Sequence, residues 1–107
     1  MALRVDAAIA GEGKFSGIYT WGAEVETFSP CGSNKEYWVR ASDAATNDLS
    51  KAHQRLTTRP YEGIYVDVVG FYAGPTSDEY GFEGQYEGLF DIEKVTVTRK
   101  SGPSDCK

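Results

Sequence analysis

The stretch YTWGAEVETFSPCGSNKEYWV, residues 19–39, decides how the first part of this 107-residue chain folds. Residues 15–28 alternate between two faces, break at Gly22 and restart, which predicts a strand, a bend or bulge, and a second extended piece. SPCGSN at 29–34 follows with Pro, Gly, Ser and Asn, the residues that form turns. The alternation resumes in EYWVRAS at 36–42. We therefore expect three antiparallel strands in succession.

One helix is predicted after these strands, in SDAATNDLSKAHQRLTTRP at 42–60. Its apolar residues recur at intervals of four, three and four and so share one helical stripe: Ala45, Leu49, Ala52 and Leu56. Ser42 or Thr46 is suited to cap the start, and Pro60 to stop the chain from continuing as a helix. The pattern predicts a helix over 44–58.

Two further strands are expected in YEGIYVDVVGFYAG, 61–74, and FDIEKVTVTRK, 90–100, with a bulge or bend at Gly70. The acidic, glycine-rich segment between them favours a long hairpin loop. Three strands, a helix and two strands is the element order of an OB-fold. We therefore predict one all-β domain over 1–107, a five-stranded OB-fold-like barrel, closed or partly open, with the helix between strands 3 and 4. Residues 1–13 would be an N-terminal extension and 101–107 a polar tail.

Charge and hydropathy exclude some classes of protein. The net charge is −5, and residues 61–107 carry the whole acidic excess. An acidic surface repels phosphate backbones and so disfavours nucleic-acid binding. No apolar run approaches the roughly 20 residues of a membrane-spanning helix. The first residues lack the features of a secretory signal, so we expect either a cytosolic protein or a mature domain without its signal.

The two cysteines leave three interpretations open. Cys31 lies in the predicted turn, and Cys106 is next to last in the chain. A cysteine nucleophile needs a nearby base, and His53 in the predicted helix is the only imidazole. A metal site needs three or four ligands, which these three residues do not offer at any paired spacing. We favour a Cys31–Cys106 disulfide that pins the polar tail, over two free cysteines and over catalysis or metal binding.

Other titratable residues give weak signals. We expect His53, at the edge of the apolar stripe, to face solvent and not to carry protons. Five acids between residues 78 and 91 offer the oxygen ligands that hard cations take: Asp78, Glu79, Glu83, Glu87 and Asp91. No calcium-loop motif is present, so we expect a solvated acidic loop. We predict no enzyme activity, no metal and no cofactor.

The aromatic residues of the strands are the more informative group, although core packing is the default for any one of them. If Tyr37 and Val39 point into the barrel, their strand neighbours point outward. The exposed face of strands 2 and 3 is where OB barrels stack their ligands. The candidate ligand-binding residues on this face are Trp38, Arg40, Glu24 and Glu26. We expect Trp21, on the same face as Tyr19, to belong to the core.

GIYTWGAEVETFSPCGSNKEYWV, residues 17–39, resembles OB-like domains of bacterial envelope proteins, including the C-terminal domain of NlpE-type copper-resistance lipoproteins. The CxxC pairs of the NlpE N-terminal domain are missing here, so no metal or redox role follows from the resemblance. It implies a periplasmic or envelope location and an interaction role without catalytic residues.

We therefore expect a monomeric, non-catalytic binding module of the bacterial envelope that contacts a protein or a small ligand through the face of strands 2 and 3. One alternative is an OB domain that binds single-stranded nucleic acid, which the fold allows but the charge opposes. Another is a small enzyme of unknown class, for which no nucleophile has a base nearby. A cytoplasmic location is the alternative to the envelope.

Overall fold

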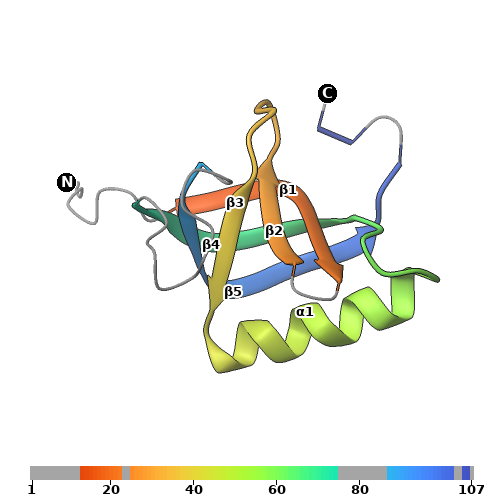
Figure 1. The fold of residues 1–107 in the computed structure, drawn as a ribbon. Coiled ribbons are helices and arrows are strands. Elements are labelled where there is room, and N and C mark those ends of the chain that lie inside the picture. The colour runs from red at the N-terminus through yellow and green to blue at the C-terminus, as the bar shows by residue number, and fades with distance from the viewer. Residues whose placement is uncertain (1–12, 23–24, 75–86, 103–104, 107) are drawn as a thin grey trace.

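The computed structural model describes residues 13–22, 25–74, 87–102 and 105–106. Its elements follow the predicted order: β1 (Gly13–Gly22), β2 (Val25–Pro30), β3 (Tyr37–Ala41), α1 (Asp43–Leu56), β4 (Ile64–Gly74) and β5 (Leu89–Lys100). The strands close into a barrel in the order β1-β2-β3-β5-β4, and α1 lies across one end of it (Figure 1). The predicted five-stranded OB-type barrel, with its helix between strands 3 and 4, is confirmed.

Strand pairing is antiparallel everywhere except where the barrel closes. There β3 runs parallel to β5, and Trp38 to Ala41 pair with Leu89 to Ile92. β4 pairs with β1 on one side and with β5 on the other. Both pairings cover more residues than those of β1 with β2 and of β3 with β5. β2 and β3 share only two residue pairs, Thr27 with Trp38 and Phe28 with Tyr37.

Every strand and the apolar stripe of α1 contribute to one core. Three of its aromatic rings pack together, since the centroid of the Phe90 ring lies 5.0 Å from the centroids of both Phe15 and Phe28. The buried core residues are Tyr19, Phe28, Val39, Ala45, Leu49, Ala52, Ile64, Val66, Val68, Phe90 and Ile92. The helical stripe predicted from the sequence therefore covers the open end of the barrel.

Both ends of α1 are capped by side chains. The Ser42 hydroxyl accepts a hydrogen bond from the N–H of Ala45, which satisfies a donor that the first turn leaves unpaired. At the other end, the Thr57 hydroxyl donates to the carbonyl of His53 at 2.7 Å. These caps place the helix at Asp43–Leu56, within two residues of the predicted bounds.

Gly70 lies where β4 changes register with β5. A Cβ atom there would overlap the carbonyl oxygen of Asp91, so the close approach of the two strands requires glycine. The predicted irregularity at Gly70 is confirmed. In the part of the chain that the structure describes, no helix is long and apolar enough to cross a membrane.

Candidate functional site

The candidate face is the outer side of β2, β3 and the first residues of β5. Trp38 lies opposite Thr27 of β2, and Arg40 lies beside Asp91 of β5. Strand neighbours two apart share a face, so Trp38 and Arg40 both point outward, as predicted. Trp38 is half-buried and Arg40 is exposed.

An ion pair fixes the guanidinium on this face. Arg40 Nε lies 2.7 Å from Asp91 Oδ1, and Nη2 lies 2.9 Å from Oδ2. Such a two-point contact sets the plane of the guanidinium as well as its position. A shallow hollow of about 210 Å³ adjoins the pair, and its lining includes Ser42 and Glu93. Asp91, predicted only as part of the acidic segment, thus belongs to the face.

Glu26 lies elsewhere. Phe28 and Tyr37 pair across the strands with their side chains toward the core, and Glu26 shares their face because it is two residues from Phe28. Its Oε2 accepts a hydrogen bond from the hydroxyl of Tyr19 at 2.7 Å. The structure therefore places Glu26 on the inner side of β2 and not beside Trp38. Glu24 lies outside the described residues.

The Tyr19–Glu26 pair is electrostatically perturbed. Burial raises the pKa of the Glu26 carboxyl, and the hydrogen bond from Tyr19 partly offsets this rise. Burial also raises the pKa of the Tyr19 hydroxyl, and the neighbouring Glu26 carboxylate adds to the effect. Glu26 is thus a half-buried acid whose charged form is costly, as expected for a carboxylate with one neutral hydrogen-bond donor.

His53 was predicted to face solvent, and that prediction is wrong. The residue is 4% exposed, and its Nε2 lies 2.7 Å from the carbonyl oxygen of Glu62. The rings of Tyr19 and Trp21 contact the imidazole edge to face, at centroid distances of 6.3 and 5.8 Å. The segment after α1 folds back over the helix end, a long-range contact that helical periodicity does not reveal.

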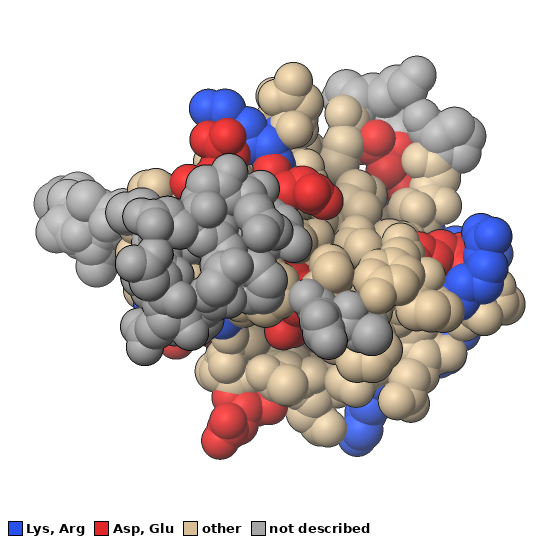
Figure 2. All heavy atoms as spheres, in the orientation of Figure 1, with Lys and Arg blue, Asp and Glu red and all other residues tan. Residues whose placement is uncertain are grey.

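Trp21 also departs from its expected place. The residue is 46% exposed, although its side chain lies on the inner face of β1 and touches His53. β1 extends past the region where β4 pairs with it, so its last inward-facing residue lies at the rim of the barrel. Tyr61, 52% exposed, adjoins this rim, and its N–H donates to the carbonyl of Trp21. Figure 2 shows mainly uncharged side chains around this end of β1.

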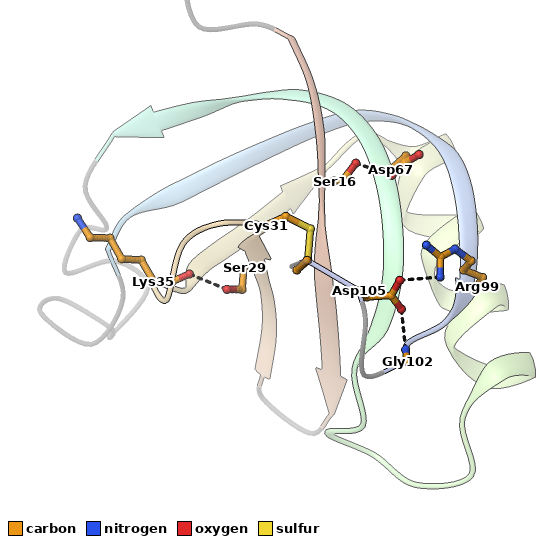
Figure 3. The surroundings of a disulfide bond; sticks show 9 residues. Ser16, Ser29, Cys31, Lys35, Asp67, Arg99, Gly102 and Asp105 are labelled. Atoms are coloured by element: carbon orange, nitrogen blue, oxygen red, sulfur yellow. Dashed lines mark hydrogen bonds and ion pairs between the residues drawn. A yellow bond between two sulfur atoms is a disulfide. The ribbon is translucent and has the colours of Figure 1, made fainter.

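The predicted disulfide is present. Cys31 and Cys106 are bridged with their Cα atoms 4.5 Å apart, across 75 residues of sequence (Figure 3). The Cys31 N–H donates to the carbonyl of Ser16, so the bridge is anchored to the barrel wall. Asp105, next to the bridge, pairs with Arg99 at 2.8 Å. The backbone N–H of Gly102, together with this guanidinium, lowers the pKa of the Asp105 carboxyl.

The predicted acidic loop falls largely outside the described residues, including Asp78, Glu79 and Glu83. Glu87 forms an ion pair with Lys35 at 3.7 Å, and Asp91 pairs with Arg40. Within the described ranges, no group of three or more His, Cys, Asp or Glu side chains is arranged to hold a metal ion.

The structure is thus an OB-type barrel, and Trp38 and the Arg40–Asp91 ion pair lie on its β2 and β3 face. A disulfide ties Cys106, near the end of the chain, to Cys31. No curated protein and no solved structure matches the chain. A comparison with protein families matches residues 11–102 to the NlpE C-terminal OB domain. NlpE proteins are envelope lipoproteins. Because this match covers most of the chain, the chain belongs to the NlpE C-terminal OB domain family.

Proposed function

We propose that this domain is a non-catalytic binding module of the bacterial envelope, which contacts a protein or a small ligand through the outer face of β2 and β3. The observation that carries the proposal is that Trp38 and Arg40 lie on one outer surface, where Asp91 holds the Arg40 guanidinium in place. Membership of an envelope OB family gives the fold a context in which binding is the expected role.

The chemistry of the face suits a polar partner with an apolar part. The half-buried indole of Trp38 offers a flat surface, and tryptophan is among the residues that most often dominate binding energies. Arg40 and Asp91 hold each other in a defined orientation, so a partner meets both charges without having to order them first.

Charge argues against single-stranded nucleic acid as the partner. Binding to phosphates depends on several unneutralised cations along a groove. Arg40 on this face is already paired with Asp91, and the whole chain carries a net charge of −5. A protein or a small ligand therefore fits the face better.

An extracytoplasmic location is supported by two independent observations. The family is one of envelope lipoproteins, and the chain has a disulfide between Cys31 and Cys106. Disulfides persist in oxidising compartments such as the periplasm and are rare in the cytosol. We infer that the domain works on the periplasmic side of the envelope or attached to it.

Photocrosslinking in bacterial cells tests the proposal. A photoreactive residue replaces Glu93, which is exposed beside the Arg40–Asp91 pair, and in a matched control it replaces Lys14, an exposed residue of β1. We expect adducts from position 93 and not from position 14, seen as a larger protein band or as a small added mass. Trp38→Ala and Arg40→Ala in the position-93 protein should each remove them. Equal adducts from both positions, or adducts that survive both substitutions, would contradict the proposal.

A further inference from the structure

β5 continues well past its last contact with β3. β3 pairs with β5 only along Leu89 to Ile92, whereas β4 pairs with it from Leu89 to Lys100. In an antiparallel pair, every second residue directs its N–H and C=O away from the partner strand. Beyond Glu93, these outward groups of β5 have no backbone partner among the residues that the structure describes.

Part of this edge is regular enough to accept another strand. Two shifts in the register with β4 leave out Glu93 and Thr96, and such irregularities normally block edge pairing. After them, Val97 to Lys100 pair residue by residue with Asp67 to Ile64 of β4. Val97 is 40% exposed. It lies in the run VTVTRK, in which the Val and Thr residues favour strand structure and the last two residues are basic. The last four residues of β5 therefore form a regular strand edge with no second partner strand among the described residues.

A groove lies beside this edge, between β5 and α1. Its volume is about 220 Å³, and it is lined by Asp48, Lys51, Ala52 and Arg55 of α1 and by Val95, Thr96, Val97 and Thr98 of β5. Figure 1 shows α1 running below β5 along this stretch. The Arg55 guanidinium reaches to 3.4 Å from the Thr98 hydroxyl and so lies at the strand edge itself.

The groove is basic in an otherwise acidic molecule. Lys51 and Arg55 form no ion pair with any residue that the structure describes, and Asp48 is the one acid in the groove lining. Both cations project from α1, on the wall that an added strand would face. Their charges are therefore available to carboxylates on a bound segment, in a chain with a net charge of −5.

We propose that the edge of β5 from Val97 to Lys100 takes up an extended, acidic segment of a partner protein as an added strand. The outward N–H and C=O groups of β5 supply the main-chain hydrogen bonds, as in other cases of strand addition. Lys51 and Arg55 select for acidic side chains on that segment. This surface is separate from the outer face of β2 and β3.

Charge distinguishes this partner from a second copy of the chain. Two copies joined edge to edge through β5 would bring two sets of Lys51 and Arg55 close to the same contact. Like charges across such a contact weaken it. An acidic segment from another protein meets the same groups with attraction.

Fluorescence anisotropy with a defined probe tests the inference. The probe is a labelled, acetylated and amidated heptapeptide of alternating Glu and Val, and its control replaces each Glu by Lys. A third peptide keeps the Glu and Val side chains but is N-methylated at alternate residues, which removes strand pairing only. We expect the acidic probe to bind at least tenfold more tightly than either of the others. Equal binding of the N-methylated peptide would refute strand addition, and so would no measurable binding of the acidic probe.

Two protein variants locate the site. Lys51→Glu should weaken binding of the acidic probe at least tenfold, while Lys14→Glu, the same charge change at an exposed position of β1, should alter it less than twofold. Amide NMR shift changes caused by the probe should concentrate on Val97 to Lys100. Shifts on Trp38 and Arg40 instead would overturn the inference, as would concentration-dependent dimerisation that Val97→Lys abolishes. Arg40→Ala should leave probe binding unchanged, so failure here is distinct from failure of the β2 and β3 face.

Discussion

Nε2 of His53 lies 2.7 Å from the carbonyl oxygen of Glu62 and ties the end of α1 to the segment that leads into β4. A carbonyl oxygen only accepts hydrogen bonds, so Nε2 carries the proton and donates it. The imidazole is buried, and the rings of Tyr19 and Trp21 pack against it. His53 thus joins three segments at one end of the barrel.

Replacing His53 by Ala should destabilise the fold. The change removes a buried hydrogen bond, leaves the Glu62 carbonyl without this donor, and opens a cavity beside two aromatic rings, for which we expect a loss of about 2–4 kcal/mol in the free energy of unfolding. Urea denaturation measures it. Gln54→Ala, at the exposed neighbouring position, is the control and should change stability by less than about 0.5 kcal/mol. A His53 variant as stable as the Gln54 variant would show that the contact contributes little.

The case of His53 shows how far the sequence alone leads. The stripe of Ala45, Leu49, Ala52 and Leu56 identifies the helix and its buried face, because that periodicity is local. His53 lies next to this stripe, and its burial depends on residues from β1 and on Glu62, which come together only in the folded chain. Local patterns therefore give the elements and their order, but not the contacts made beyond an element's end.

The candidate face shows the same division. Alternation places Trp38 and Arg40 outward, since the period of a strand is fixed by its geometry. It does not give the register between strands, which decides that Glu26 meets Tyr19 and that Asp91 reaches Arg40. The ion pair joins residues 51 apart in sequence. No local pattern carries that information.

Loss of the disulfide should lower stability without abolishing the fold. The bridge spans 75 residues, and the chain-entropy relation gives about 4 kcal/mol as an upper value for closing such a loop. The barrel core includes neither cysteine, so we expect the Cys31→Ser, Cys106→Ser protein to keep its fold with a lower Tm. Calorimetry measures the change. Oxidised wild-type protein should take up no alkylating agent before reduction, and two alkylated thiols in it would contradict the bridge.

Glu26→Gln should stabilise the protein at neutral pH. The pKa of Glu26 is raised in the folded state, so folding favours the protonated carboxyl, and this contribution is lost as the pH rises through the folded pKa. Gln avoids the cost of burying a charge and still accepts the hydrogen bond from Tyr19. The advantage of the variant should shrink toward low pH, where the carboxyl is protonated in both states. Urea denaturation at several pH values measures this, and an advantage that grows on acidification would contradict the assignment.

Replacing Trp21 or Trp38 by Ala should lower the stability of the protein by different amounts. Trp21 is 46% exposed, while Trp38 is the more buried of the two. Replacing a fully buried large aromatic residue by Ala lowers the free energy of unfolding by about 3–5 kcal/mol, and the loss is smaller when the residue is exposed. We therefore expect the order of destabilisation to be Phe28→Ala, Trp38→Ala, then Trp21→Ala, with Phe28, which is fully buried, as the reference.

Chemical denaturation of the three variants decides the order, and Trp38→Phe separates the two roles of Trp38. If Trp38 serves mainly as a binding surface, Phe at this position should restore most of the stability and only part of the adduct formation at position 93, because its ring offers a smaller platform. A Trp21→Ala protein that unfolds as readily as Phe28→Ala would mean that the contact of Trp21 with His53 outweighs its exposure. In that case the rim of the barrel would be part of its core.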